Sequence, residues 1–305
     1  MPDTLPILDE LRGDLGRAYR RAEKPRRWWI PAGGLAAAAA AAVLVVVLVG
    51  GGVAPSRATA ATALRKAADV AGRQSAPVPA ADQYFYVHSH QVNLSTRVNT
   101  DGSVTNDLVT ADRQIWTSVD KPGRLETTTL AVQRLEGPGE QRHPGGHGVD
   151  QLPAEHGYYF GAEKLSRAEL LAYPTDPQAI YDRLRAGVGD RGNSPEGEVF
   201  TEIGDALREA PAPAELRAGL YRALALVPGV ELVGNVKDPQ GRDGLAVAFT
   251  EVGIRYELIF DPQTADMLAE RETVVAPERG LPKPGTVIGN SSYLERAVTD
   301  ATVRP

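Results

Sequence analysis

The longest unbroken apolar stretch of the chain runs from Leu35 to Val49, inside an uncharged run that extends from Trp28 to Ser56. A bilayer core of about 30 Å needs roughly 20 helical residues to cross it. Extended to residues 30–54, the apolar stretch is long enough, so we expect a transmembrane helix there.

Charges flank this segment unevenly. Six basic residues precede it, at Arg17, Arg20, Arg21, Lys24, Arg26 and Arg27, whereas only Arg57 follows closely. The positive-inside rule then predicts a cytoplasmic tail at 1–29 and a single-pass protein of the cell membrane, with its C-terminal domain outside the cytoplasm. The alternative is a cleaved secretory signal that ends near Ala58-Thr59-Ala60. Either interpretation exports the rest of the chain.

Beyond the apolar run, the pattern alternates between helix and strand periods. Residues 59–74 place Leu64 and three alanines on one helical face, which predicts a juxtamembrane helix within a linker at 55–80. Period-two alternation at 83–95 predicts a strand, and the turn at Asp101-Gly102 predicts an antiparallel meander through about residue 135. We interpret residues 137–157 as a loop.

A block of helices is expected next, at about 164–228. Ser166, Asp176 and Ser194 each have the sequence pattern of a helix N-cap, and Pro228-Gly229 ends the last apolar face. Strand patterns then resume from 230 to 303. The predicted fold class is α+β: one N-terminal transmembrane helix, followed by a curved, half-barrel-like antiparallel sheet with an inserted helical block. The extracytoplasmic domain would span 81–305.

Composition removes several classes of function. The chain of 305 residues has no cysteine, which excludes disulfides, thiol catalysis and zinc–thiolate sites. Its net charge is −6; because residues 1–29 carry +2, the remainder carries −8. An acidic main domain argues against nucleic acid as a partner, since binding it requires a basic face.

Four segments carry a resemblance to a family of proteins. They are ATALRKAADVAGRQ at 61–74, QYFYVHS at 83–89, YPTDPQAIYDRLRAG at 173–187 and GTVIGNSSYLERAVTD at 285–300. The chain resembles uncharacterised actinobacterial single-pass membrane proteins, and its exported domain is similar to the half-barrels of lipoprotein carriers and RseB-type sensors. The resemblance implies an architecture and a sigma factor as a partner, but no catalytic motif.

Motifs for chemistry are sparse. His88 and His90 should project from one face of a strand about 6.5 Å apart, a spacing that a metal ion can bridge, although two partly buried or solvated histidines are the simpler interpretation. The letters GxGxxG at 187–192 follow a predicted helix, whereas a dinucleotide site requires them to follow a strand. With no nucleophile elbow, P-loop or HExxH sequence, we expect neither an enzyme nor a cofactor.

Two groups of apolar residues are candidate binding sites. An apolar ligand groove is predicted at Tyr84, Tyr86, Trp116, Tyr158, Tyr159 and Phe160, with ordinary core packing as the alternative. In the tail, Leu8, Leu11 and Leu15 form a stripe that can dock on a cytoplasmic regulatory protein or lie on the inner membrane leaflet. We therefore expect a membrane-anchored envelope sensor or binding protein that regulates a partner such as a sigma factor. The alternative is a tethered carrier or structural protein that binds apolar ligands without signalling.

Overall fold

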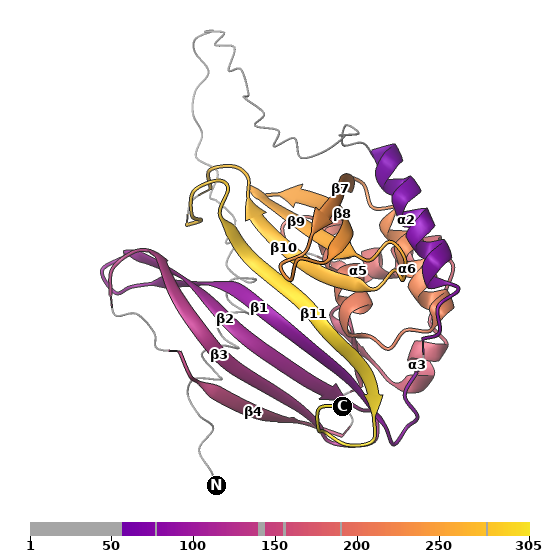
Figure 1. Cartoon of the computed structure of the whole chain (residues 1–305). Coiled ribbons are helices and arrows are strands. Elements are labelled where there is room, and N and C mark those ends of the chain that lie inside the picture. The colour runs from indigo at the N-terminus through magenta and orange to yellow at the C-terminus, as the bar shows by residue number, and fades with distance from the viewer. Residues whose placement is uncertain (1–56, 77, 140–143, 155–156, 190, 279) are drawn as a thin grey trace.

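A computed structural model describes residues 57–305, apart from 77, 140–143, 155–156, 190 and 279. A nine-stranded antiparallel sheet dominates it, with the strand order β4-β3-β2-β1-β11-β10-β9-β8-β7 (Figure 1). Its strands are β1 (Tyr84–Val98), β2 (Val104–Thr117), β3 (Gly123–Glu136), β4 (His147–Leu152), β7 (Glu231–Lys237), β8 (Asp243–Glu251), β9 (Ile254–Phe260), β10 (Met267–Val274) and β11 (Val287–Thr299). A separate short hairpin pairs β5 (Tyr158–Phe160) with β6 (Glu163–Leu165). Two meanders, β1–β4 and β7–β10, thus meet at β11.

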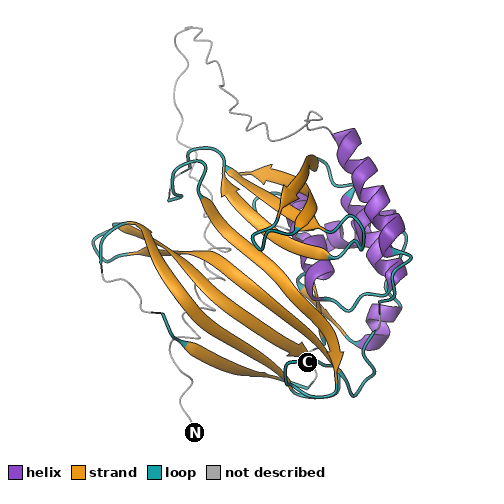
Figure 2. Ribbon diagram, in the orientation of Figure 1, coloured by secondary structure: helices purple, strands orange, loops and turns teal. Residues whose placement is uncertain are grey.

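The described helices gather on one side of the sheet (Figure 2). They are α2 (Arg57–Ala71), α3 (Arg167–Leu171), α4 (Pro177–Val188), α5 (Pro195–Glu209) and α6 (Ala214–Leu224). The three predicted helix starts are confirmed: Ser166 forms a capping box with Glu169, while the side chains of Asp176 and Ser194 accept hydrogen bonds from backbone N–H groups of the first turns of α4 and α5.

The main core lies between these helices and one face of the sheet. Strand alternation sends Phe85 and Val87 of β1 toward the helices, while Tyr84 and Tyr86 point to the opposite, outer face. The predicted helix at 59–74 is confirmed as α2, whose Leu64 is fully buried and whose alanines pack against α6. Small side chains allow these two helices to approach closely.

The predicted fold class is wrong. The described residues form mostly one large antiparallel sheet with few helices, rather than a transmembrane helix followed by a half-barrel with a helical block. None of the helices in this part of the chain is long and apolar enough to cross a membrane; α2 and α5 have 15 residues each, whereas a span needs about 20. The predicted transmembrane segment at 30–54 lies outside the described residues. Local periodicity located these helices but cannot show that strands from both sides of the helical block join one nine-stranded sheet.

The predicted loop at 137–157 is also partly wrong, because residues 147–152 form edge strand β4 beside β3. Glycine-rich flanks hid this strand in the sequence.

A partly exposed arginine, Arg242, ties the sheet together where its register shifts. Pairing slips between Met267 and Ala269 of β10, and again where β11 passes β1. Arg242, in the turn just before β8, donates to the carbonyl of Leu268 at 2.8 Å and to that of Tyr293 at 2.9 Å. It also pairs with the fully buried carboxylate of Asp238. One guanidinium thus satisfies carbonyl oxygens at both irregular strands.

Candidate functional site

Charged side chains meet between the last turn of α5 and the middle of the sheet. Arg208 of α5 reaches Asp205, one turn earlier, at 2.9 Å and Glu270 of β10 at 2.9 Å. Beside it, Glu209 accepts a hydrogen bond from Arg113 of β2 at 2.7 Å. We call these residues, together with Glu272 of β10 and Tyr293 and Arg296 of β11, the charged cluster. It is assembled from four elements that are far apart in the sequence.

The cluster is enclosed but still reached by water. The side chains of Arg208, Asp205 and Glu270 are 29%, 26% and 20% exposed, although they lie between a helix and a sheet. Arg296 donates to the carbonyl of Arg208 at 3.1 Å and so satisfies the C-terminal end of α5. Four carboxyl groups face three guanidinium groups, so the cluster has an excess of negative charge when every carboxyl group is ionised.

This environment shifts the acidity of the carboxyl groups in opposite directions. Burial raises the pKa of Asp205 to about 7, with Arg208 opposing the shift and Glu270 and Glu209 adding to it. Burial and the neighbouring Glu270 likewise raise the pKa of Glu272 to about 7. Burial acts on Glu209 too, but Arg113 and Arg208 outweigh it and hold the pKa of that carboxyl below its usual range. Perturbed carboxyl groups gathered at one place are typical of functional sites, although structural ion pairs perturb pKa values too.

The two histidines proposed as weak metal ligands lie on the outer face, away from the charged cluster. His88 is buried and its Nδ1 has no hydrogen-bond partner among the described residues, whereas His90 pairs with Asp112 at 2.7 Å. Burial lowers the pKa of His88. Within the described part of the chain, no three His, Asp or Glu side chains are arranged to hold a metal ion.

The aromatic residues proposed for a ligand groove fall into two separate groups. Tyr84, Tyr86 and Trp116 form an outer-face cluster, in which the Tyr86 and Trp116 rings lie 4.8 Å apart and the indole N–H donates to the carbonyl of Val303. Tyr158 and Phe160 are fully buried in the main core beneath the helices, and Tyr159 is partly buried beside Lys164. The structure does not bring the two groups together, and contact of any of them with a ligand stays a prediction.

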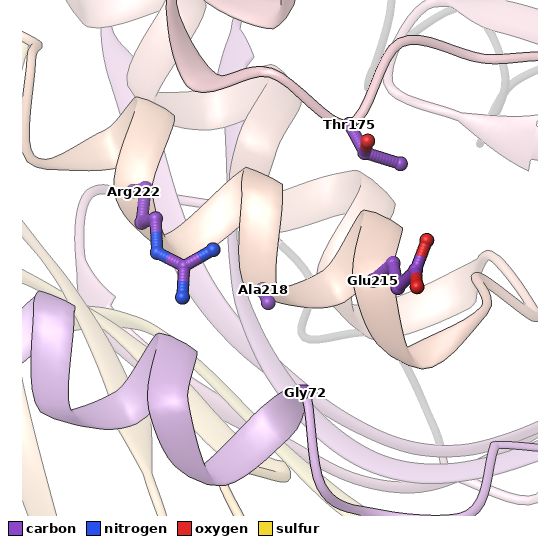
Figure 3. Close-up of a pocket in the computed structure, with 5 residues that line it drawn as sticks. All are labelled: Gly72, Thr175, Glu215, Ala218 and Arg222. Atoms are coloured by element: carbon purple, nitrogen blue, oxygen red, sulfur yellow. The ribbon is translucent and has the colours of Figure 1, made fainter.

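A small pocket lies near the end of α2. It has a volume of about 240 Å³ and is lined by Gly72, Thr175, Glu215, Ala218 and Arg222. Figure 3 shows Glu215, Ala218 and Arg222 along α6, with Gly72 and Thr175 across from them. Arg222 is already paired with Asp69 at 3.0 Å, and ligand pockets are usually larger, about 300–1,000 Å³. The charged cluster is therefore the stronger candidate site.

No family model matches the chain, and no curated protein matches it either. Its function therefore has to be inferred from the geometry of the charged cluster and from the sequence of the N-terminal part. The tail residues Leu8, Leu11 and Leu15 lie outside the described residues, so their docking role stays a prediction.

Sequence patterns alone did not single out the charged cluster. Its one visible signal is in β10, where Glu270 and Glu272 share a face of a strand that begins with the apolar residues Met267, Leu268 and Ala269. Two carboxyl groups on one face usually mean a solvated surface. The structure shows that β10 sits inside the sheet between β9 and β11, and the contact of Glu270 with Arg208 shows that this face of β10 lies under α5.

Proposed function

We propose that the protein is a membrane-anchored binding or sensor protein of the cell envelope. The uncharged run at 30–54 would hold it in the membrane, the domain formed by the described residues would receive a ligand or partner, and the tail would contact a cytoplasmic regulator such as a sigma factor. The membrane anchor and the tail rest on the sequence, including its resemblance to single-pass proteins.

The observation that carries the binding role is the water-accessible charged cluster in the middle of the domain. Groups of buried ion pairs contribute little net stability, because desolvating the charges costs about as much as their attraction returns. An apolar core at the same place would serve folding at least as well. Retaining Arg208, Glu270 and their neighbours there is better explained by recognition of a charged or polar group than by stability.

The alternative function, a tethered carrier that binds apolar ligands, has less support from the structure. Beneath the helices, Tyr158 and Phe160 of the proposed groove are 0% exposed and present no surface to a ligand. The part of the sheet face that water reaches, below the end of α5, is charged. A site for an apolar molecule needs mostly apolar lining.

The proposal is tested by crosslinking in native membranes, followed by affinity purification and mass spectrometry. Three chains are compared: the full chain, a variant lacking residues 5–15, and the full chain with Glu270→Gln. We expect the tail deletion to remove a cytoplasmic regulator only, and Glu270→Gln to remove an extracytoplasmic component only. Identical lists from all three chains would refute the proposal, as would protease protection that places residues 57–305 in the cytoplasm.

A further inference from the structure

Glu272 is the carboxyl group of the charged cluster that has no cation of its own. It makes no hydrogen bond or ion pair with another described residue, whereas Glu270, two positions earlier on the same face, holds Arg208 at 2.9 Å. Its neighbour on β11 is Gly289, and a Cβ atom there would lie 3.0 Å from Glu272 Oε2. The carboxyl group therefore rests over bare backbone in a space that a larger residue at 289 would fill.

The groups around Glu272 offer it little positive charge. From β10 it faces Glu270, from β9 the ring of Tyr256, and from β11 the backbone of Gly289. Arg208 of α5 is the one cation that acts on it appreciably, and Arg208 is already bound to Asp205 and Glu270. An ionised Glu272 would thus place a second negative charge beside that of Glu270.

A buried hydroxyl group lies at the same place. Tyr293 is 3% exposed, and its hydroxyl interacts with the carboxylate of Glu270. The charges that act most on it are those of Glu270 and Arg208, so it belongs to this cluster. The Tyr293 hydroxyl can donate to an ionised Glu270, so Glu272 is the group on the β10–β11 side of the cluster that lacks a partner when every acid is ionised.

We propose that Glu272 and Asp205, beside the two ends of the Arg208–Glu270 ion pair, form a proton-binding site, and that loss of these protons loosens α5 from the sheet. The protons on Glu272 and Asp205 exchange with solvent, which reaches the cluster. The inference rests on the proposed function, since it names the proton as a signal that the exported domain receives.

The direction of the response follows from the raised pKa values of the two carboxyl groups. Both pKa values lie near 7, whereas the ordinary values are 3.8 for Asp205 and 4.5 for Glu272. The folded state therefore binds more protons than the unfolded state between these values, and its stability falls as the pH rises toward and through 7. Above that range, all four carboxyl groups of the cluster are charged and face the guanidinium groups of Arg113, Arg208 and Arg296. Repulsion between Asp205 of α5 and Glu270 of β10 then acts on the contact between the helix and the strand.

The test is hydrogen exchange of the full chain at pH 5.5 and 8.0, corrected for the intrinsic effect of pH, with the peptides of α5 followed by mass spectrometry. Each pKa unit corresponds to a factor of about ten in an equilibrium, so we expect opening of α5 to rise at least tenfold between these pH values. Glu272→Gln should remove most of the rise. The matched control is Glu231→Gln, which removes the same charge from the exposed start of β7 and should leave the rise intact.

Asp205→Asn repeats the test from the helix side, in case Glu272→Gln does not fold. A flat pH response of the wild-type chain would overturn the inference, as would a control variant that behaves like Glu272→Gln. Because the partner lists from crosslinking do not depend on this response, failure of the proton site and failure of the proposed binding role give different results.

Discussion

Arg242 provides a direct test of how the sheet tolerates its irregular strands. Replacing it with Gln removes the charge that faces Asp238, whose side chain is 0% exposed, and the donors to the carbonyls of Leu268 and Tyr293. Breaking a buried ion pair from one side costs about 3–5 kcal/mol, and because Arg242 is 35% exposed the lower end of that range applies here. Asp238 keeps hydrogen bonds from the backbone N–H groups of Gln240 and Arg242, and water can replace donors to carbonyls, so we expect a loss of about 3 kcal/mol.

The same hairpin supplies a matched control. Lys237 pairs with Asp243 at 2.7 Å, but these side chains are 64% and 89% exposed, so Lys237→Gln should cost under about 0.5 kcal/mol. Urea unfolding of the full chain, followed by circular dichroism, compares the free energies of unfolding. Arg242→Lys should recover only part of the loss, because a single ammonium cannot contact both carbonyls as the planar guanidinium does. Equal costs for Arg242→Gln and Lys237→Gln would refute this account of the register shifts.

Two further perturbations test other contacts. Gly219→Ala should destabilise the protein by about 1–3 kcal/mol in urea unfolding, because its Cβ would lie 2.5 Å from the carbonyl oxygen of Thr175; an unchanged midpoint would mean that α6 and the segment before α4 shift apart freely. The lowered pKa of His88 means that the folded state holds this ring neutral while the unfolded state protonates it below about pH 6.5, so stability is lost as the pH falls. His88→Gln should reduce that loss between pH 7 and 5, and an identical pH profile for both chains would contradict the assignment.

How far the sequence predicts this structure depends on the range of the interaction. Helix starts were predictable because a cap is decided within four residues: Ser166 and Glu169 satisfy each other's backbone partners wherever the helix lies. The fold class was not predictable, because the pairing of β1 with β11 joins residues about 200 positions apart and leaves no pattern in the local sequence. The charged cluster depends on the same pairing, since Arg113, Glu209 and Glu270 meet only once the sheet has formed.

The order of the strands also has a consequence for folding. Among the described strands, β11 follows both meanders in the sequence but occupies the middle of the sheet, between β1 and β10 (Figure 1). The two meanders can each form locally, yet they cannot combine until residues 287–299 have been synthesised and delivered. Such a high contact order slows folding and leaves the facing edges of β1 and β10 unpaired meanwhile. The newly made chain therefore depends on the insertion of β11 after both meanders have been synthesised. Chaperones that shield the unpaired edges of β1 and β10 should determine how much of the protein folds rather than aggregates.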